Sequence, residues 1–142
     1  MEIDSLEPPA WLGLGNQEYR DLLRRKAVAH KRRDQKRGGR YSIKEAMEAI
    51  DTAFRAATGI DPYDGLPMDP KLLGHYDNAA SQSDGSAYKR RFARLPTIDH
   101  IDGKPEATFE IVSWQTNDAK GDMNREEFLD YCRRVVRHAD GA

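Results

Sequence analysis

Residues 95–104, LPTIDHIDGK, place a carboxylate and an imidazole side by side in a short stretch of strand-forming residues. Alternate residues of this stretch do not sort into an apolar and a polar face, so burial alone does not account for Asp99 and His100. A second strand-like run, FEIVS, follows at residues 109–113, after a turn region that contains Gly-Lys-Pro. The pattern predicts a hairpin over residues 97–101 and 109–113, with the Asp-His pair on its first strand.

The hairpin leads directly into WQTNDAK at residues 114–120, which predicts a short helix that returns to the first strand. On such a helix Asn117 offers an amide oxygen, a hard ligand that suits Mg²⁺ beside a carboxylate. Lys120 lies one turn later on the same helical face. Because adjacent strand residues point to opposite sides, Asp99 and His100 need a bend or a groove to act on one substrate. Carboxylate, amide, imidazole and ammonium groups together favour phosphodiester hydrolysis.

Each of these side chains has a defined part in that chemistry. His100 fits a general base that takes a proton from water, because imidazole is the common side chain whose pKa lies close to neutral pH. Asp99 and Asn117 fit the ligands of one divalent ion, Mg²⁺ or Mn²⁺, that neutralises charge developing on the scissile phosphate. Lys120 fits a contact to a phosphate oxygen. Taken singly, the same residues also fit a surface strand pair, a helix cap and an ordinary surface lysine.

A strongly basic segment precedes the hairpin. Residues 20–40 hold ten Lys or Arg against two Asp, a local formal charge of +8 in a chain whose net charge is −1. Apolar spacing predicts a helix over residues 16–36 that ends at Gly38-Gly39. A merely solvated face usually mixes charge signs, so we expect nucleic-acid contact, with an anionic membrane surface as the weaker alternative. The residues of this helix expected to contact nucleic acid are Arg24, Arg25, Lys31, Arg32, Arg33, Lys36 and Arg37.

Two further helices are predicted by their caps. Ser42 and Glu45 form a capping-box pattern before an amphipathic run that Gly59 ends. The pattern indicates a helix that packs in the core and has no candidate catalytic residue. Asn124 and Glu127 can cap a C-terminal helix in the same way. We expect the apolar face of this last helix to pack on the core, with its cysteine as a core thiol. That face consists of Phe128, Tyr131, Cys132, Val135 and Val136.

The segment between the first helices and the hairpin, residues 60–94, is rich in turn signals, which predicts loops with short structured pieces. Near its end a second basic cluster lies beside two aromatic residues, Tyr88 and Phe92. The members of this cluster are Lys89, Arg90, Arg91 and Arg94. Basic and aromatic side chains together suit a phosphate backbone and an unstacked base. Ordinary surface charge is an equally good interpretation of this cluster.

The length of 142 residues favours one compact unit, with an N-terminal helical region at 1–59 and a hairpin region at 60–142. No apolar run approaches the roughly 18 to 20 residues of a membrane helix. The acidic N-terminus does not match a secretory signal, so we expect a cytoplasmic location and no membrane partner. The single cysteine, Cys132, excludes an internal disulfide and a multi-cysteine zinc knuckle.

The segments PTIDHIDG, FEIVSWQTNDAKGD and EEFLDYC, taken in order, resemble the HNH endonuclease family. That family carries an Asp-His pair on the first strand and an Asn-x-x-Lys sequence at the helix of a ββα-metal fold. The resemblance covers about residues 61–132. It implies an α+β fold with additional N-terminal and C-terminal helices, metal ligands at Asp99 and Asn117, and a general base at His100. DNA, bound mainly through phosphates, is the implied partner, and a catalytically inactive nucleic-acid-binding module of the same fold is the alternative.

The chain also departs from that family. Many members frame the site with two Cys-x-x-Cys zinc knuckles, whereas here Asp61 and Asp64 stand in place of the first pair and Ser113 and Thr116 in place of the second. A structural zinc ion typically takes four Cys or His ligands, and one cysteine with four scattered histidines does not offer such a set. We therefore expect no structural zinc.

Overall fold

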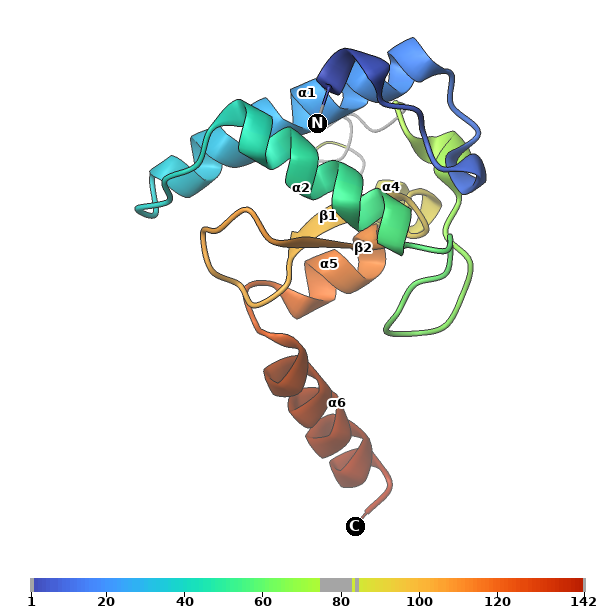
Figure 1. The fold of residues 1–142 in the computed structure, drawn as a ribbon. Coiled ribbons are helices and arrows are strands. Elements are labelled where there is room, and N and C mark those ends of the chain that lie inside the picture. Colours follow the sequence, from blue (N-terminus) through green and yellow to red (C-terminus); the bar gives the residue numbers. More distant parts are fainter. Residues whose placement is uncertain (1, 75–82, 84, 142) are drawn as a thin grey trace.

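The computed structural model describes residues 2–74, 83 and 85–141. Two long helices, α1 (Asn16–Gln35) and α2 (Ile43–Ala56), pack against each other, and α2 also packs on β2 of a small antiparallel sheet. The sheet consists of β1 (Pro96–His100) and β2 (Phe109–Ser113), as the sequence predicts apart from a shift of one residue in β1. The class is therefore α+β, with the two-stranded sheet beneath the helical pair (Figure 1).

The remaining elements are shorter or lie at the edge of the molecule. α5 (Trp114–Lys120) follows β2 without a loop and contacts both strands on the side away from α2 (Figure 1). A six-residue helix, α4 (Ser86–Arg91), precedes β1, and α6 (Arg125–Ala139) forms the C-terminal end. Three short 3₁₀ helices, Ile3–Ser5, Ala10–Leu12 and Pro70–Leu72, complete the described secondary structure.

The core is built from one face of each long helix and the inner face of the sheet. α1 contributes Tyr19, Leu22, Leu23 and Ala27, all nearly inaccessible, at the three-and-four spacing that puts residues on one side of a helix. The partners of this face come from α2 and from the strands. They are Ala46, Met47, Ile50, Ala53, Phe54, Ile98, Phe109 and Ile111. Regions 1–59 and 60–142 thus share one apolar core.

The predicted capping boxes are confirmed at two helices. Ser42 Oγ accepts from the Glu45 amide at 3.0 Å, and Glu45 Oε1 accepts from the Ser42 amide at 3.2 Å. Asn124 and Glu127 make the same reciprocal pair at 2.9 and 3.1 Å. These bonds satisfy amide groups that have no partner inside the helix, and so they fix where α2 and α6 begin.

The loop between β1 and β2 is held at both sides by close backbone contacts. Arg37 Nη2 donates to the Gly103 carbonyl at 2.7 Å, which ties the loop to the end of α1. Gly103 has φ of 76°, and a Cβ there would lie 2.1 Å from the Asp122 carbonyl oxygen, so only glycine fits. The hairpin loop therefore spans from α1 to the segment after α5.

Residues 60–74 and 85–94 contain more order than the turn signals indicate. Arg94 holds this segment by a bidentate ion pair with Asp64, at 2.8 and 3.2 Å, and by bonds to the Leu66 and Pro67 carbonyls. Lys89, Arg90 and Arg91 lie on α4, one of the short structured pieces expected in this segment. Arg94 is thus a structural residue.

The prediction that α6 closes over the core is wrong. None of its residues is buried, and Tyr131, Val135 and Val136 are each half exposed or more. Cys132 is only partly buried, so it is not a core thiol. The helix projects from the body of the protein (Figure 1), and its first turn contacts Tyr63 through Arg125 and Phe128. Amphipathic spacing predicts the helix but does not say whether a partner surface exists within the chain.

Among the described residues, no helix combines the length and the apolar character needed to cross a bilayer.

Candidate active site and nucleic-acid interface

A groove runs along α1, between this helix and the unit formed by β1 and α5. Its largest part is a cavity of about 480 Å³, lined by His30, Asp34, Asp99, His100 and Asn117. Two neighbouring cavities extend the groove along α1. We call the three together the α1 groove. The α1 side chains that line it, in chain order, are Leu22, Arg25, Lys26, His30, Arg33 and Asp34, followed by Lys36 and Arg37 at the helix end.

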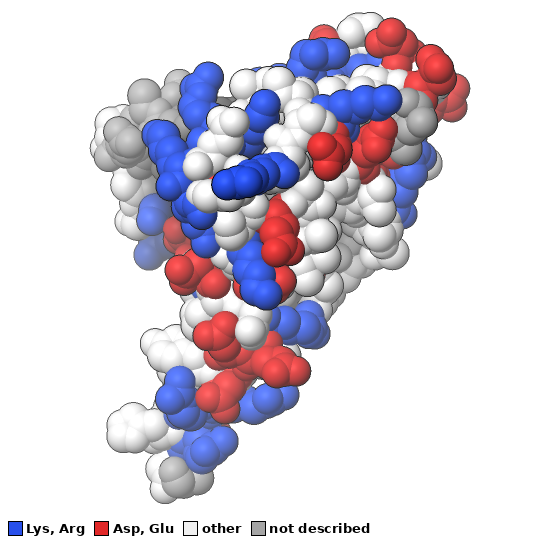
Figure 2. Space-filling model, turned by 60° about the vertical axis from the view of Figure 1, so that its left-hand side comes forward, with Lys and Arg blue, Asp and Glu red and all other residues white. Residues whose placement is uncertain are grey.

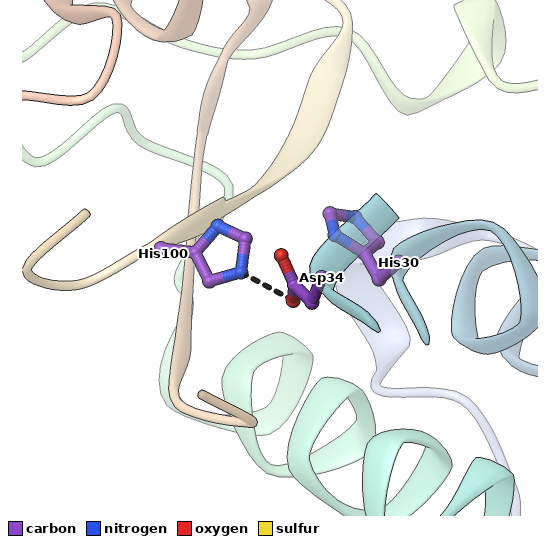
Figure 3. A group of neighbouring side chains, drawn as sticks. All are labelled: His30, Asp34 and His100. Atoms are coloured by element: carbon purple, nitrogen blue, oxygen red, sulfur yellow. Dashed lines mark hydrogen bonds and ion pairs between the residues drawn. The ribbon is translucent and has the colours of Figure 1, made fainter. Parts of the chain in front are cut away.

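His100 lies at the end of β1 and points toward α1. Its Nε2 atom is 2.7 Å from Oδ2 of Asp34, a carboxylate that is 2% exposed (Figure 3). Tyr41 donates a second hydrogen bond to the same Asp34 oxygen. A carboxylate only accepts hydrogen bonds, so the ring proton of a neutral His100 sits on Nε2 and the lone pair sits on Nδ1. Asp34 therefore selects the tautomer that a general base at Nδ1 needs.

A second imidazole stands beside this pair. His30 is one turn before Asp34 on the same face of α1, and its ring lies edge to face with that of His100 at 5.7 Å (Figure 3). Burial lowers the pKa of His30 to about 3, with further lowering from Arg33 and His100. Burial of His30 therefore favours its neutral form.

Asp99 points to the other side of β1, toward α5. Lys120 Nζ lies 2.8 Å from Asp99 Oδ2, and this ion pair is buried, with 0% and 7% of the two side chains exposed. The pair lacks the geometry of a hydrogen bond, and neither atom has another partner in the described part of the chain. Burial raises the pKa of Asp99, and the nearby Lys120 ammonium offsets only part of that rise.

Asn117 lies in the groove with its amide oriented by β1. Its Nδ2 donates to Thr97 Oγ1 at 3.1 Å, and Thr97 Oγ1 in turn donates to the Val112 carbonyl at 2.8 Å. This chain of bonds leaves the Asn117 Oδ1 atom without a hydrogen bond to any described residue. An amide oxygen and a carboxylate in one cavity are suitable ligands for Mg²⁺.

Three of the four residues predicted for chemistry thus line one cavity. Asp99, His100 and Asn117 meet there, whereas Lys120 is fully buried behind Asp99 and is absent from the groove lining. This placement differs from the expected contact between Lys120 and a phosphate oxygen. The ammonium group instead neutralises Asp99, because a buried carboxylate needs a charge partner.

The basic residues of α1 divide into two sets. Arg25, Arg33, Lys36 and Arg37 line the α1 groove, together with Lys26, which the sequence analysis did not single out. Burial lowers the pKa of Lys26, and the neighbouring Arg25 and Arg33 lower it further. The other predicted contacts, Arg24, Lys31 and Arg32, lie outside the groove lining. Figure 2 shows Lys and Arg side chains gathered at the upper left of the visible face, with Asp and Glu side chains beside them toward the middle and the lower end.

The α4 cluster makes local contacts. Lys89 is 3.7 Å from Asp118 in an exposed ion pair and lies over the ring of Trp114 at 5.8 Å. Arg91 covers the rings of Tyr88 and Phe92 at 5.4 and 5.0 Å. Arg90 is exposed on the same short helix. Aromatic and basic groups do lie together here, as the sequence indicates, but the Tyr88 and Phe92 rings are buried rather than open to a base.

The four residues compared above with zinc-knuckle positions do not form one cluster. Asp61 contacts Ser113 and Thr116, whereas Asp64 pairs with Arg94. Asp61 is inaccessible and accepts from the Ser113 amide at 2.9 Å and from the Tyr63 amide at 2.6 Å. Burial by itself would raise the pKa of Asp61, but hydrogen bonds from Ser113, Tyr63 and Thr116 outweigh it and lower the pKa. The Asp61 carboxylate therefore joins residues 61–66 to the start of α5.

No family model, curated protein or solved structure matches this chain. The chemistry of the α1 groove is therefore the basis for assigning a function. Two of its residues, His30 and Asp34, escaped the sequence analysis because one imidazole on an apolar helix face and one acid in a basic run each look ordinary. Their spacing of four residues, which places both side chains on one face, is the signal that was available.

Proposed function

We propose that the protein is a metal-dependent endonuclease of the HNH type that hydrolyses phosphodiester bonds in DNA. The observation that carries the proposal is the α1 groove, where basic side chains of α1 face Asp99, His100 and Asn117. A DNA strand in this groove would have its phosphates between those cations and the candidate reactive groups. The order strand, strand, helix in β1, β2 and α5 is also the order of a ββα-metal unit.

His100 acts as the general base in this proposal. Its Nδ1 atom takes a proton from the water that attacks phosphorus, while Nε2–H remains bonded to Asp34. The imidazolium that forms is stabilised by the buried Asp34 carboxylate, in the way that an aspartate supports the histidine of a hydrolase triad. Asp34 is a positioning residue, since it acts through His100.

Asp99 and Asn117 fit the ligands of a divalent cation, Mg²⁺ or Mn²⁺. Lys120 is near one oxygen of Asp99 and leaves the other for a cation, and Asn117 Oδ1 is uncommitted in the described part of the chain. When bound, such an ion would neutralise charge on the scissile phosphate and on the leaving oxygen. Thr97 holds the Asn117 amide in a fixed orientation for that role.

A second function is a DNA-binding module without catalysis. The Asp99–Lys120 ion pair favours it, because the carboxylate proposed as a metal ligand already has a cationic partner at 2.8 Å. Such a module would bind DNA with strong salt dependence and would not need a divalent ion.

The test is cleavage of supercoiled plasmid by the purified chain, with and without Mg²⁺. We expect cleavage with Mg²⁺ only, and His100→Ala should lower the rate by about 10²- to 10⁴-fold while DNA affinity stays nearly unchanged. His138→Ala, on the exposed face of α6, is the matched control and should cleave at the wild-type rate. Tight binding without cleavage under any divalent ion would favour the binding module, and wild-type cleavage by His100→Ala would remove His100 from the mechanism.

A further inference from the structure

Three possible metal ligands from two elements meet in the α1 groove. His30 and Asp34 come from one face of α1 and His100 from the end of β1, and one ligand atom of each lies within 4.8 Å of the other two (Figure 3). A zinc ion with bonds of about 2.1 Å separates its ligand atoms by about 3.4 Å. The three ligand atoms, which lie within 4.8 Å of one another, would move closer by side-chain rotation to bind such an ion.

The surroundings of the three groups suit a metal ion with one open position. His30 and Asp34 are 7% and 2% exposed, so protein fixes their positions, while the His100 side chain is 15% exposed and faces the cavity. The bond from Tyr41 to Asp34 orients the carboxylate, as partners behind a ligand do in metal sites. The cavity leaves room for water as a fourth ligand.

The donor set discriminates between kinds of metal. Two imidazoles and one carboxylate suit Zn²⁺ or Co²⁺, whereas Mg²⁺ prefers oxygen ligands only. Arg33, Lys36 and Arg37 line the same cavity, and their positive charge weakens the binding of any cation there. The ion is thus expected to exchange with solution rather than to hold the fold together.

We infer that His30, Asp34 and His100 form a transition-metal site, separate from Asp99 and Asn117, and that Zn²⁺ bound there switches off His100. Both sets of residues line the same cavity, but their partners differ, since His100 points to Asp34 on α1 and Asp99 to Lys120 on α5. The inhibitory part rests on the proposed nuclease function, and the binding part does not.

The inhibition follows from the tautomers of one ring. When the ring of His100 is neutral in the metal-free protein, Nε2 carries the proton and donates to Asp34, so Nδ1 has the free lone pair. Coordination through Nε2 requires that lone pair on Nε2, and the proton then moves through solvent to Nδ1. The ring keeps one proton throughout, but Nδ1 can no longer accept one from water.

Binding is tested on the metal-stripped full chain by titration with Co²⁺, followed by visible absorption, and with Zn²⁺, followed by calorimetry. The wild-type chain and the control His138→Gln should each bind one equivalent. His30→Gln and His100→Gln should each lower the affinity by at least about 10-fold. Two variants from different elements are used because one of them could lose its fold, which circular dichroism would reveal. Absence of binding by the wild-type chain, or equal affinity in folded His30→Gln, would overturn the site.

Inhibition is tested by plasmid cleavage in excess Mg²⁺. For each protein, the cleavage rate with Zn²⁺ is divided by the rate without Zn²⁺. This ratio should be about 0.1 or less for the wild-type chain and for His138→Gln, since a general base is lost. For His30→Gln it should stay near one. If the wild-type chain binds Zn²⁺ but cleaves equally fast, the inhibitory part is overturned. If it cleaves no DNA with any ion, the proposed function fails, while the binding titration still decides the metal site.

Discussion

Asp34 is an acid inside a basic helix, and its side chain is turned away from the other charges into the protein. There it accepts hydrogen bonds from His100 and from Tyr41 through one oxygen, while its backbone carbonyl accepts from Gly39 at 2.8 Å. The residue thus links the end of α1 to the last residue of β1. If His100 is a general base, Asp34 controls which of its nitrogen atoms carries the proton.

The effect of Asp34 on the His100 tautomer can be distinguished from a loss of stability by comparing a single variant with a double variant. Tyr41→Phe removes one partner of Asp34 and should change cleavage only slightly. Asp34→Ala in the Tyr41→Phe background leaves no tyrosine hydroxyl unpaired and should lower the cleavage rate by about 10²-fold or more relative to Tyr41→Phe. The proton of His100 should also spread to Nδ1, which long-range ¹H–¹⁵N spectra of the ring report. An unchanged tautomer in the double variant would contradict this role.

Asp61 is the second acid with a structural task. It is fully buried and accepts from amides on both sides of the junction between residues 61–66 and α5. Removing an acceptor lowers the free energy of unfolding by more than the hydrogen bond itself contributes, because the buried N–H donors cannot form replacement hydrogen bonds with water. The junction also sets the start of α5, and so the position of Asn117.

Asp61→Asn should lower the free energy of unfolding by about 1–3 kcal/mol, because an amide NH₂ would face backbone N–H donors. The lowered pKa of Asp61 gives this contribution a pH dependence. It is fully present above the ordinary value of 3.8 and is lost as the pH falls through the lower folded-state value.

Urea unfolding at several pH values measures this effect through the midpoint. The control is Asp102→Asn, whose exposed pair with Lys104 should change stability by less than about 0.5 kcal/mol. Equal midpoints for the two variants at neutral pH would show that the Asp61 junction is not important for the fold.

α1 serves two surfaces at once. Its apolar face packs on α2, and a second face carries the basic side chains that line the groove. The outer basic residues, Arg24, Lys31 and Arg32, share the charge of the helix but lie outside that lining. This division allows three basic residues of the groove to be compared with the three outside it.

Replacing Arg25, Arg33 and Lys36 by Gln should weaken binding to any DNA sequence. If each contacts one phosphate, the slope of log K against log salt should shrink by about 0.9 per residue. Replacing Arg24, Lys31 and Arg32 by Gln changes the net charge equally and should leave most of the slope in place. Binding titrations by fluorescence anisotropy over a range of salt concentrations measure both. Equal loss of slope in the two triple variants would mean that only net charge matters, not the groove.

Local sequence signals predicted the elements well where the causes are local. The capping boxes at Ser42 and Asn124, the hairpin and the short helix at 114–120 all depend on residues a few positions apart. The position of α6 depends instead on whether a complementary apolar surface exists elsewhere, which spacing does not reveal. Its exposed apolar face is the part of the fold that the sequence predicted wrongly.

The candidate site was predictable in part for the same reason. Asp99, His100 and Asn117 belong to one continuous motif, and they do line one cavity. Asp34 reaches His100 across 66 residues of sequence, and no local pattern links the two. Burial of Lys120 behind Asp99 is likewise a result of tertiary packing, because helical spacing gives the face of a residue but not the depth at which it lies.

The whole molecule should fold without a metal ion. One apolar core joins both regions, and the Asp61 carboxylate occupies a position that resembles a zinc-knuckle ligand position. We expect no tightly held zinc by elemental analysis of the purified, dialysed protein. A chelator should stop cleavage and leave the melting temperature nearly unchanged, since an ion held by two protein ligands adds little to stability. A chelator that unfolds the chain would contradict this view.

α6 has one more consequence, which concerns how the chain unfolds. Its first turn contacts Tyr63, and none of the side chains described for this helix is buried. Its backbone hydrogen bonds therefore have little more protection than those of a free peptide helix, which frays readily in water at this length. In hydrogen–deuterium exchange the amides of α6 should exchange early by local fraying, while those of α2 and β2 wait for global opening. The protein thus carries a helix whose folding is scarcely coupled to that of its core.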